Sequence, residues 1–164
     1  MEIIRIERED APALRFIGRR YGADANYGAM WGQWWANGWF EPLDKLEGRA
    51  EINQDSYCAA KRIVNGGLEY WIGMFFAPAT EAPEGYESVE MSPLSYAVCY
   101  LRDKEGSPEL TGLDTHNRCL EEMTRQGYVR KEDDWCFERY QCPRYTTPDE
   151  EGRIILDYGI AIEA

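Results

Sequence analysis

Residues 135–142 contain the side chain with the clearest potential for ligand chemistry, Glu138. Side chains alternate between the two faces of a strand, so Glu138 and Tyr140 are expected on the same face. Phe137 and Arg139 then lie on the opposite face. A carboxylate among aromatic rings can hold a cation by charge and by the ring quadrupole together. The residues alone favour a simpler arrangement, an outward-facing glutamate paired with Arg139 or with a lysine on the neighbouring strand.

Aromatic side chains are abundant, with six tryptophans, eleven tyrosines and five phenylalanines. Four tryptophans follow the i, i+3, i+4, i+8 spacing of one helix face, namely Trp31, Trp34, Trp35 and Trp39. Such a stripe is far more often core than ligand wall, because aromatic rings dominate core burial. The total still exceeds what a small core usually requires, which leaves rings to line a ligand site.

Signatures for a metal, a cofactor or a catalytic nucleophile are weak. The single histidine, His116, stands three residues before Cys119, and these two cannot complete a tetrahedral zinc site. Acidic loops at 131–134 and 148–152 lack the alternating oxygen spacing of a calcium-binding loop. The sequence also lacks the glycine-rich nucleotide-binding motifs and the G-x-S-x-G and H-E-x-x-H motifs. No cofactor, metal or catalytic residue is therefore assigned.

The charge balance restricts the class of partner. Thirty acidic residues against 18 basic ones give a formal charge of -12, which repels phosphate backbones and anionic lipids. Nucleic acid and membranes are therefore not expected partners, whereas a cationic ligand or a basic protein face is.

The longest apolar run, residues 71–79, is too short for a membrane helix. The charged N-terminal segment and five cysteines without a C-x-x-C pair predict a cytoplasmic protein with reduced thiols.

The first half of the chain predicts a hairpin, a helix and a second hairpin. Two short apolar segments around an acidic, proline-containing turn predict the first hairpin. The helix carries the tryptophan stripe, with a break near Pro42. Residues 65–67, Asn-Gly-Gly, predict the second hairpin, because Asn-Gly between β-prone runs is the strongest short hairpin signal. The predicted elements are strands at 3–6 and 14–17, a helix at 30–46, and strands at 57–64 and 68–76.

The second half predicts the same order again. Ser92-Pro93 separates two strand candidates, and a stripe of leucine and methionine predicts a helix that ends at Gly127. Residues 77–85, rich in proline and small residues, are the expected linker between halves of about 1–80 and 81–164. The predicted elements are strands at 86–91 and 94–102, a helix at 108–126, and strands at 135–142 and 153–162.

A chain of 164 residues suits a single domain, here residues 1–164. If each helix buries its apolar stripe on the strands of its own half, the result is an α+β protein whose halves join into one antiparallel sheet. Phe137 is then expected to pack under a helix. Arg139 is expected near the rim of that layer, with its stem on apolar surface and its charge in water.

Four short motifs each occur once along this duplicated order of elements. They are Glu-Tyr-Trp-Ile-Gly-Met-Phe-Phe at 69–76, Tyr-Ala-Val-Cys-Tyr at 96–100, Phe-Glu-Arg-Tyr at 137–140 and Ile-Leu-Asp-Tyr-Gly at 155–159. In this combination the chain resembles, over nearly its whole length, the GyrI-like superfamily, which includes effector-binding domains of AraC- and MerR-type transcription regulators. The resemblance implies duplicated strand-helix-strand-strand modules with two main helices and a central ligand cleft. Members commonly bind aromatic or cationic drugs, and some stand-alone members hydrolyse cyclopropane-bearing alkylating compounds.

The resemblance also implies site residues. In the superfamily, a buried acidic residue that contacts cationic ligands lies on a strand with a Phe-Glu-x-Tyr-like sequence. Residues 137–140 match that pattern. Glu138 is therefore expected to point into the cleft, within reach of rings from Trp71 or Tyr100. Tyr140 would form a further wall, and a tryptophan of the helix stripe could close the side. The predicted ligand-binding residues are Glu138, Trp71, Tyr100, Tyr140, Trp35 and Trp39.

The favoured function is capture of a hydrophobic small molecule, cationic or aromatic, in this cleft. One alternative is hydrolysis of a strained cyclopropane ring there, with a carboxylate activating water and Tyr100 or Tyr140 protonating the leaving group. Another is an acidic protein-interaction module such as a gyrase inhibitor. The sequence begins directly with the first predicted hairpin and leaves no basic recognition helix, so DNA binding by this chain alone is not expected.

Overall fold

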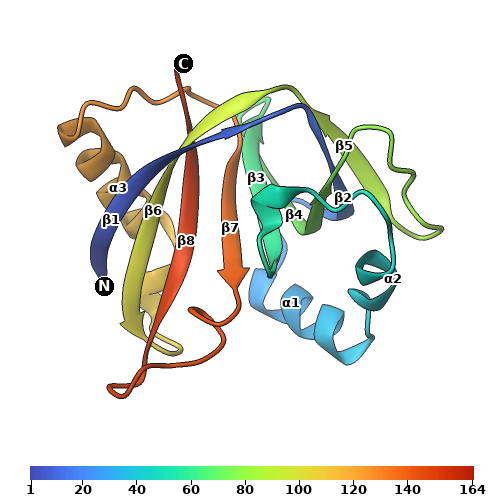
Figure 1. Ribbon diagram of the computed structural model, residues 1–164, viewed down its shortest axis with the longest axis horizontal. Coiled ribbons are helices and arrows are strands. Elements are labelled where there is room, and N and C mark those ends of the chain that lie inside the picture. The colour runs from blue at the N-terminus through green and yellow to red at the C-terminus, as the bar shows by residue number, and fades with distance from the viewer.

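The computed structural model describes all of residues 1–164 as one eight-stranded antiparallel sheet with three α-helices (Figure 1). This is the α+β architecture that the sequence predicts. Two 3₁₀ turns, Glu51–Asn53 and Pro108–Leu110, complete the regular structure. The helices are α1 (Tyr27–Ala36), α2 (Glu41–Asp44) and α3 (Leu113–Arg125). The strands are β1 (Glu2–Ala11), β2 (Leu14–Tyr21), β3 (Ser56–Val64), β4 (Gly67–Phe76), β5 (Glu87–Met91), β6 (Leu94–Lys104), β7 (Cys136–Gln141) and β8 (Arg153–Ile162).

The strand order, β1-β6-β8-β7-β3-β4-β2-β5, places β7 and β3 side by side at the centre of the sheet (Figure 1). On one face, α3 packs through Cys119 and Met123 against residues of β6 and β8. On the same face, α1 packs through Trp34 against β4 residues such as Ile72. The two helical layers therefore flank the central pair of strands.

The hairpin between β3 and β4 forms as predicted. Asn65 and Gly66 have φ angles of 51° and 77°, the positive values that a tight hairpin turn requires at both central positions. Val64 faces Gly67 across this turn, and the register continues to Cys58 opposite Gly73. This register is what aligns the β3 and β4 side chains under the helices.

The two predicted hairpins at 3–17 and 86–102 are wrong, although their strands exist. β1 pairs with β6, and β2 pairs with β4 and β5. A two-residue hairpin turn needs positive φ, and neither Pro12-Ala13 nor Ser92-Pro93 contains such a residue. The chain therefore bends without reversing at both places. Pairing of Ala11 with Leu94 and of Leu14 with Met91 brings the two bends side by side.

The helix predicted at 30–46 is two helices, and the expected break near Pro42 lies just before that residue, at 37–40. α1 begins where the Asn26 side chain accepts a hydrogen bond from the Ala29 N–H at 3.1 Å. The chain turns at Gly38, which has a φ of 65°. Pro42 lies in the first turn of α2, where a missing N–H is tolerated.

The second predicted helix is confirmed with a later start, because residues 108–110 form a 3₁₀ turn and α3 begins at Leu113. Gly127, with a φ of 92°, follows its C-terminal end as expected. None of the helices combines the length and the apolar composition of a membrane-crossing segment.

The opposite face of the sheet is closed by strands, which corrects the expectation for Phe137 and Arg139. Phe137 packs edge-to-face against Tyr96, in a core cluster to which no α-helix contributes. The Arg139 side chain is fully buried, with its Nε atom 2.7 Å from Asp157 and its Nη2 atom 2.8 Å from Glu9. The sheet curves around this cluster, so Arg139 has no solvent-exposed edge to reach. A buried guanidinium is tolerated only when it is paired with acidic groups.

Candidate ligand-binding site

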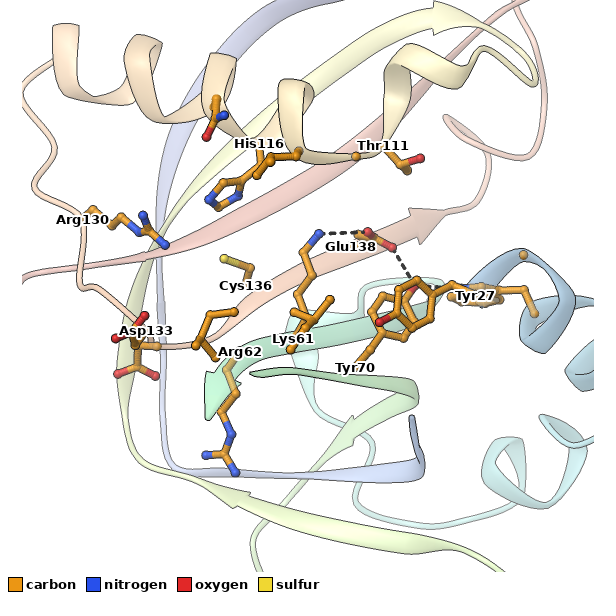
Figure 2. Close-up of a pocket in the computed structure, with 18 of the residues that line it drawn as sticks. Tyr27, Lys61, Arg62, Tyr70, Thr111, His116, Arg130, Asp133, Cys136 and Glu138 are labelled. Atoms are coloured by element: carbon orange, nitrogen blue, oxygen red, sulfur yellow. Dashed lines mark hydrogen bonds and ion pairs between the residues drawn. The ribbon is translucent and has the colours of Figure 1, made fainter. Parts of the chain in front are cut away.

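A cavity of about 690 Å³ lies over the central strands, between α1 and α3 (Figure 2). β3, β4 and β7 form its floor, α1 forms one wall, and α3 with the turn before it forms the other. Residues 130–134, between α3 and β7, contribute one end. The volume falls within the range of roughly 300–1,000 Å³ typical of small-molecule sites. The cavity lies between the two helical layers, where the sequence resemblance implied a cleft.

Glu138 lies on the floor of the cavity and is 5% exposed. Its Oε2 atom accepts hydrogen bonds from the hydroxyls of Tyr140 at 2.7 Å and Tyr70 at 3.1 Å. Its Oε1 atom lies 3.4 Å from the Nζ atom of Lys61 (Figure 2). Strand alternation therefore places Glu138 correctly. The lysine on the neighbouring strand, which the residues alone suggested as its partner, is also present.

Aromatic rings form the α1 side of the cavity. Tyr27 stacks on Tyr70 with 4.1 Å between ring centroids. The Trp31 indole N–H donates a 3.0 Å hydrogen bond to the Tyr70 hydroxyl. The Trp31 ring also meets the Tyr140 ring edge-on at 4.8 Å. Because the indole N–H and the Glu138 carboxylate hold the Tyr70 hydroxyl between them, the rings next to the carboxylate are fixed in place.

Tyr70 and Tyr140 act as hydrogen-bond donors to Glu138. Burial raises the pKa of each phenol well above its ordinary value, and the negative charge of Glu138 raises it further. Both hydroxyls therefore keep their protons at any physiological pH. The two donors compensate the carboxylate for water lost on burial.

The opposite end of the cavity is polar and carries His116 on α3 (Figure 2). The Nδ1 atom of His116 lies 2.7 Å from the Tyr158 hydroxyl. Burial, followed by the positive charges of Lys61 and Arg130, lowers the pKa of His116 to about 4. The imidazole is therefore neutral at pH 7. No group of three or more His, Cys, Asp or Glu side chains is placed to hold a metal ion.

The structure brings two of the six predicted ligand-binding residues, Glu138 and Tyr140, together in the cavity. Trp71 and Tyr100 lie elsewhere, which corrects their expected place beside Glu138. Both are buried in the cluster on the opposite face of the sheet. Trp71 follows Tyr70 in β4, so alternation directs the two side chains to opposite faces. Tyr100 lies on β6, where its ring contacts the Arg5 guanidinium at 3.8 Å.

Trp35 and Trp39 also lie outside the cavity lining, so neither closes its side. Trp35 is 60% exposed and packs against Phe40. Trp39 follows the end of α1, and its ring carries the Arg19 guanidinium at 4.0 Å. Trp31 is the member of the stripe that reaches the cavity.

Sequence reasoning did not assign five residues that shape the site. Three of them, Tyr27, Trp31 and Tyr70, provide rings, and Lys61 and His116 provide polar groups. Trp31 belongs to the tryptophan stripe, and Tyr70 belongs to the motif at 69–76, so both carried a signal. β4 is buried on both faces, which removes the alternation that would have distinguished Tyr70 from Trp71.

Solved structures share this fold, whereas no family model and no curated protein matches the sequence. SAV2435, solved with bound tetraphenylphosphonium, matches 98% of this chain and 95% of its own, at 12% identity and a TM-score of 0.67. A bacterial protein from Staphylococcus aureus MU50 matches 98% and 99%, at 14% identity and a TM-score of 0.65. The C-terminal domain of EcmrR matches 97% of each chain, at 7% identity and a TM-score of 0.61. The chain therefore shares its fold with these three solved structures, and this agrees with the fold that the sequence resemblance implies.

Proposed function

We propose that this protein binds a hydrophobic aromatic cation in the cavity between α1 and α3. The observation that carries the proposal is a buried carboxylate, Glu138, on a cavity floor beside the rings of Tyr27, Trp31, Tyr70 and Tyr140. A carboxylate supplies charge, and ring faces supply apolar contact and quadrupole attraction. Few other ligand chemistries use both. The fold shared with SAV2435, which was solved with tetraphenylphosphonium, supports this choice of ligand class.

The energetics favour a ligand that is both charged and apolar. Binding must offset the loss of the ligand's translational freedom, and burial of aromatic surface provides most of the required free energy. The carboxylate then selects for positive charge. The net charge of -12 also attracts cations to the protein at long range.

Titration calorimetry with tetraphenylphosphonium tests the proposal. Glu138→Gln keeps the shape of the side chain and removes its charge, so affinity should fall by about tenfold or more. Glu132→Gln is the matched control, because Glu132 is exposed and does not line the cavity, and its affinity should equal that of the wild type. Absence of saturable binding up to about 1 mM, or equal affinity of Glu138→Gln and wild type, contradicts the proposal.

Tryptophan fluorescence locates the binding event. Trp31 is the tryptophan that lines the cavity, so a bound phosphonium should quench its emission. Trp31→Phe should remove most of the quenching while calorimetry still detects binding. Quenching of the same amplitude in Trp31→Phe would place the ligand near another tryptophan.

We further propose that residues 1–164 act as one effector-binding domain, with related halves of about 1–80 and 81–164. The order strand, strand, helix, strand, strand appears in each half and supports this division. A reducing, cytoplasmic setting is also proposed. All five cysteines are free, and four of them are buried, which suits thiols that stay reduced.

A further inference from the structure

The Glu138 carboxylate already has a cation beside it. Lys61 projects from β3, the neighbour of β7, and its Nζ atom lies 3.4 Å from Glu138 Oε1. The same Nζ atom lies 4.7 Å from the centre of the Tyr158 ring. The Lys61 side chain is 19% exposed, so both members of the pair are largely buried. The lysine ammonium therefore lies within the cavity floor (Figure 2).

Lys61 uses the carboxylate that a ligand cation would use, Glu138, together with the face of Tyr158, a ring outside the cavity lining. A carboxylate and an aromatic face are the two elements of cation recognition in this cavity. The other carboxylate oxygen, Oε2, is occupied by the hydroxyls of Tyr70 and Tyr140. A second cation placed beside Glu138 would meet the positive charge of Lys61 at short range, in surroundings that screen charge poorly.

We infer that Lys61 is a tethered competitor for the cation site, so that a ligand must displace its ammonium from Glu138 in order to bind. This inference rests on the proposed function and names the residue that limits its affinity and selectivity. The four-carbon stem of lysine is flexible, and its ammonium can move to water while the stem stays on apolar surface.

The competition determines which cations bind. In the empty protein the floor is close to neutral, because Lys61 and Glu138 offset one another. Only conformations with Lys61 displaced can accept a cation. The apparent affinity is therefore the affinity of these conformations multiplied by the fraction of molecules that adopt them. A small hydrophilic cation gains too little apolar contact to offset this reduction. A large aromatic cation gains contact with Tyr27 and Trp31, so Lys61 favours lipophilic cations over inorganic ones.

A purely structural role for Lys61 predicts different behaviour. If the pair only holds β3 against β7, removing the ammonium should destabilise the contact between these strands and bring no gain in cation binding. Two probes separate these cases. Tetraphenylphosphonium carries a positive charge, whereas triphenylphosphine oxide presents similar rings without a net charge.

The test compares the affinity of both probes for wild type, Lys61→Met, Lys61→Gln and Lys61→Arg by titration calorimetry at low salt. Lys61→Met should bind tetraphenylphosphonium about tenfold more tightly or better, while its affinity for triphenylphosphine oxide stays near that of the wild type. Lys61→Gln, which keeps a hydrogen-bond donor for Glu138, should show the same gain and serves if Lys61→Met folds poorly. Lys61→Arg keeps the charge and should show no gain.

The matched control is Lys104→Met, an exposed strand lysine outside the cavity, which should bind both probes like the wild type. Unchanged or weaker phosphonium binding in both Lys61→Met and Lys61→Gln, with normal binding by the wild type, overturns the inference and leaves the proposed function intact. An equal gain for both probes also overturns it, because that gain reflects space rather than charge. Phosphonium binding by Lys61→Met but not by the wild type supports the competition and contradicts the proposed function of the natural chain. Failure of every variant and of the wild type to bind contradicts both.

Discussion

Individual side chains divide the cavity into an aromatic, acidic end and a polar end. Glu138 with its two tyrosine donors occupies one end, and His116 occupies the other (Figure 2). Lys61 lies between them and lowers the pKa of His116 by its positive charge, after the larger effect of burial. A cationic ligand is therefore expected at the Glu138 end, where negative charge and rings coincide.

The single histidine provides a direct test of these electrostatics by NMR. The pKa of His116 in the folded protein is about 4, below the ordinary 6.5. The unfolded chain therefore binds a proton first, and stability should decline as pH falls from about 6.5 towards 4. The decline should be small because the ring is only partly buried. Its imidazole resonances should stay in the neutral position at pH 5.5, and half-protonation near pH 6.5 contradicts the described surroundings.

Prediction of the site from sequence succeeded where one strand was enough. Alternation along β7 places Glu138 and Tyr140 on one face without knowledge of any partner. It could not locate Lys61, because the proximity of Lys61 and Glu138 depends on the pairing of β3 with β7, which places Ala59 opposite Glu138. No local pattern encodes a pairing between strands so distant in the sequence.

At the level of elements, β7 is positioned by close contact with β8. Phe137 faces Gly159 across this pair, and its ring lies where a Cβ atom of residue 159 would be, with ring carbons 2.2 to 2.6 Å from that position. The ring cannot move away easily, because Tyr96 and Phe75 meet it edge-on. The absence of a side chain at Gly159 therefore lets β7 pack closely against β8, and this contact positions Glu138.

Gly159→Ala should reduce the free energy of unfolding by about 1–3 kcal/mol through overpacking against Phe137. Gly32→Ala is the control, because Gly32 lies in α1 with no atom within 4 Å of an added Cβ. That change should raise stability by up to about 1 kcal/mol through helix propensity. Urea denaturation followed by circular dichroism measures both, and a Gly159→Ala protein as stable as the wild type contradicts the packing described.

The positions of the helices and of the β3-β4 hairpin were largely predictable from sequence. Asn65-Gly66 and Gly127 are local signals whose backbone requirements are met in place. The helix at 30–46 was predicted too long because the stripe continues past the turn at Gly38 to Trp39 and Leu43. The bends at Pro12-Ala13 and Ser92-Pro93 were misread as hairpins, since proline suits a bend and a turn equally well.

For the whole molecule, the strand order creates the site. β7 and β3 meet at the centre of the sheet, while α3 and α1 cover its two sides (Figure 1). A cavity therefore remains over the central strands. The face of those strands turned away from the cavity is buried through Cys58, Ala60 and Phe137. The sequence indicated two helices over one sheet, but the order of its strands came only from the structure.

The central claim is that a lipophilic cation occupies the cavity between α1 and α3 with Glu138 beneath it. A crystal structure of the protein soaked with tetraphenylphosphonium tests it most directly. We predict the phosphonium in this cavity, with ring centroids of Tyr27, Trp31 or Tyr70 within about 6 Å of the cation and the Lys61 ammonium moved from Glu138. A phosphonium seated elsewhere, such as the groove of about 700 Å³ lined by Glu9, Arg49 and Pro78, would contradict the account.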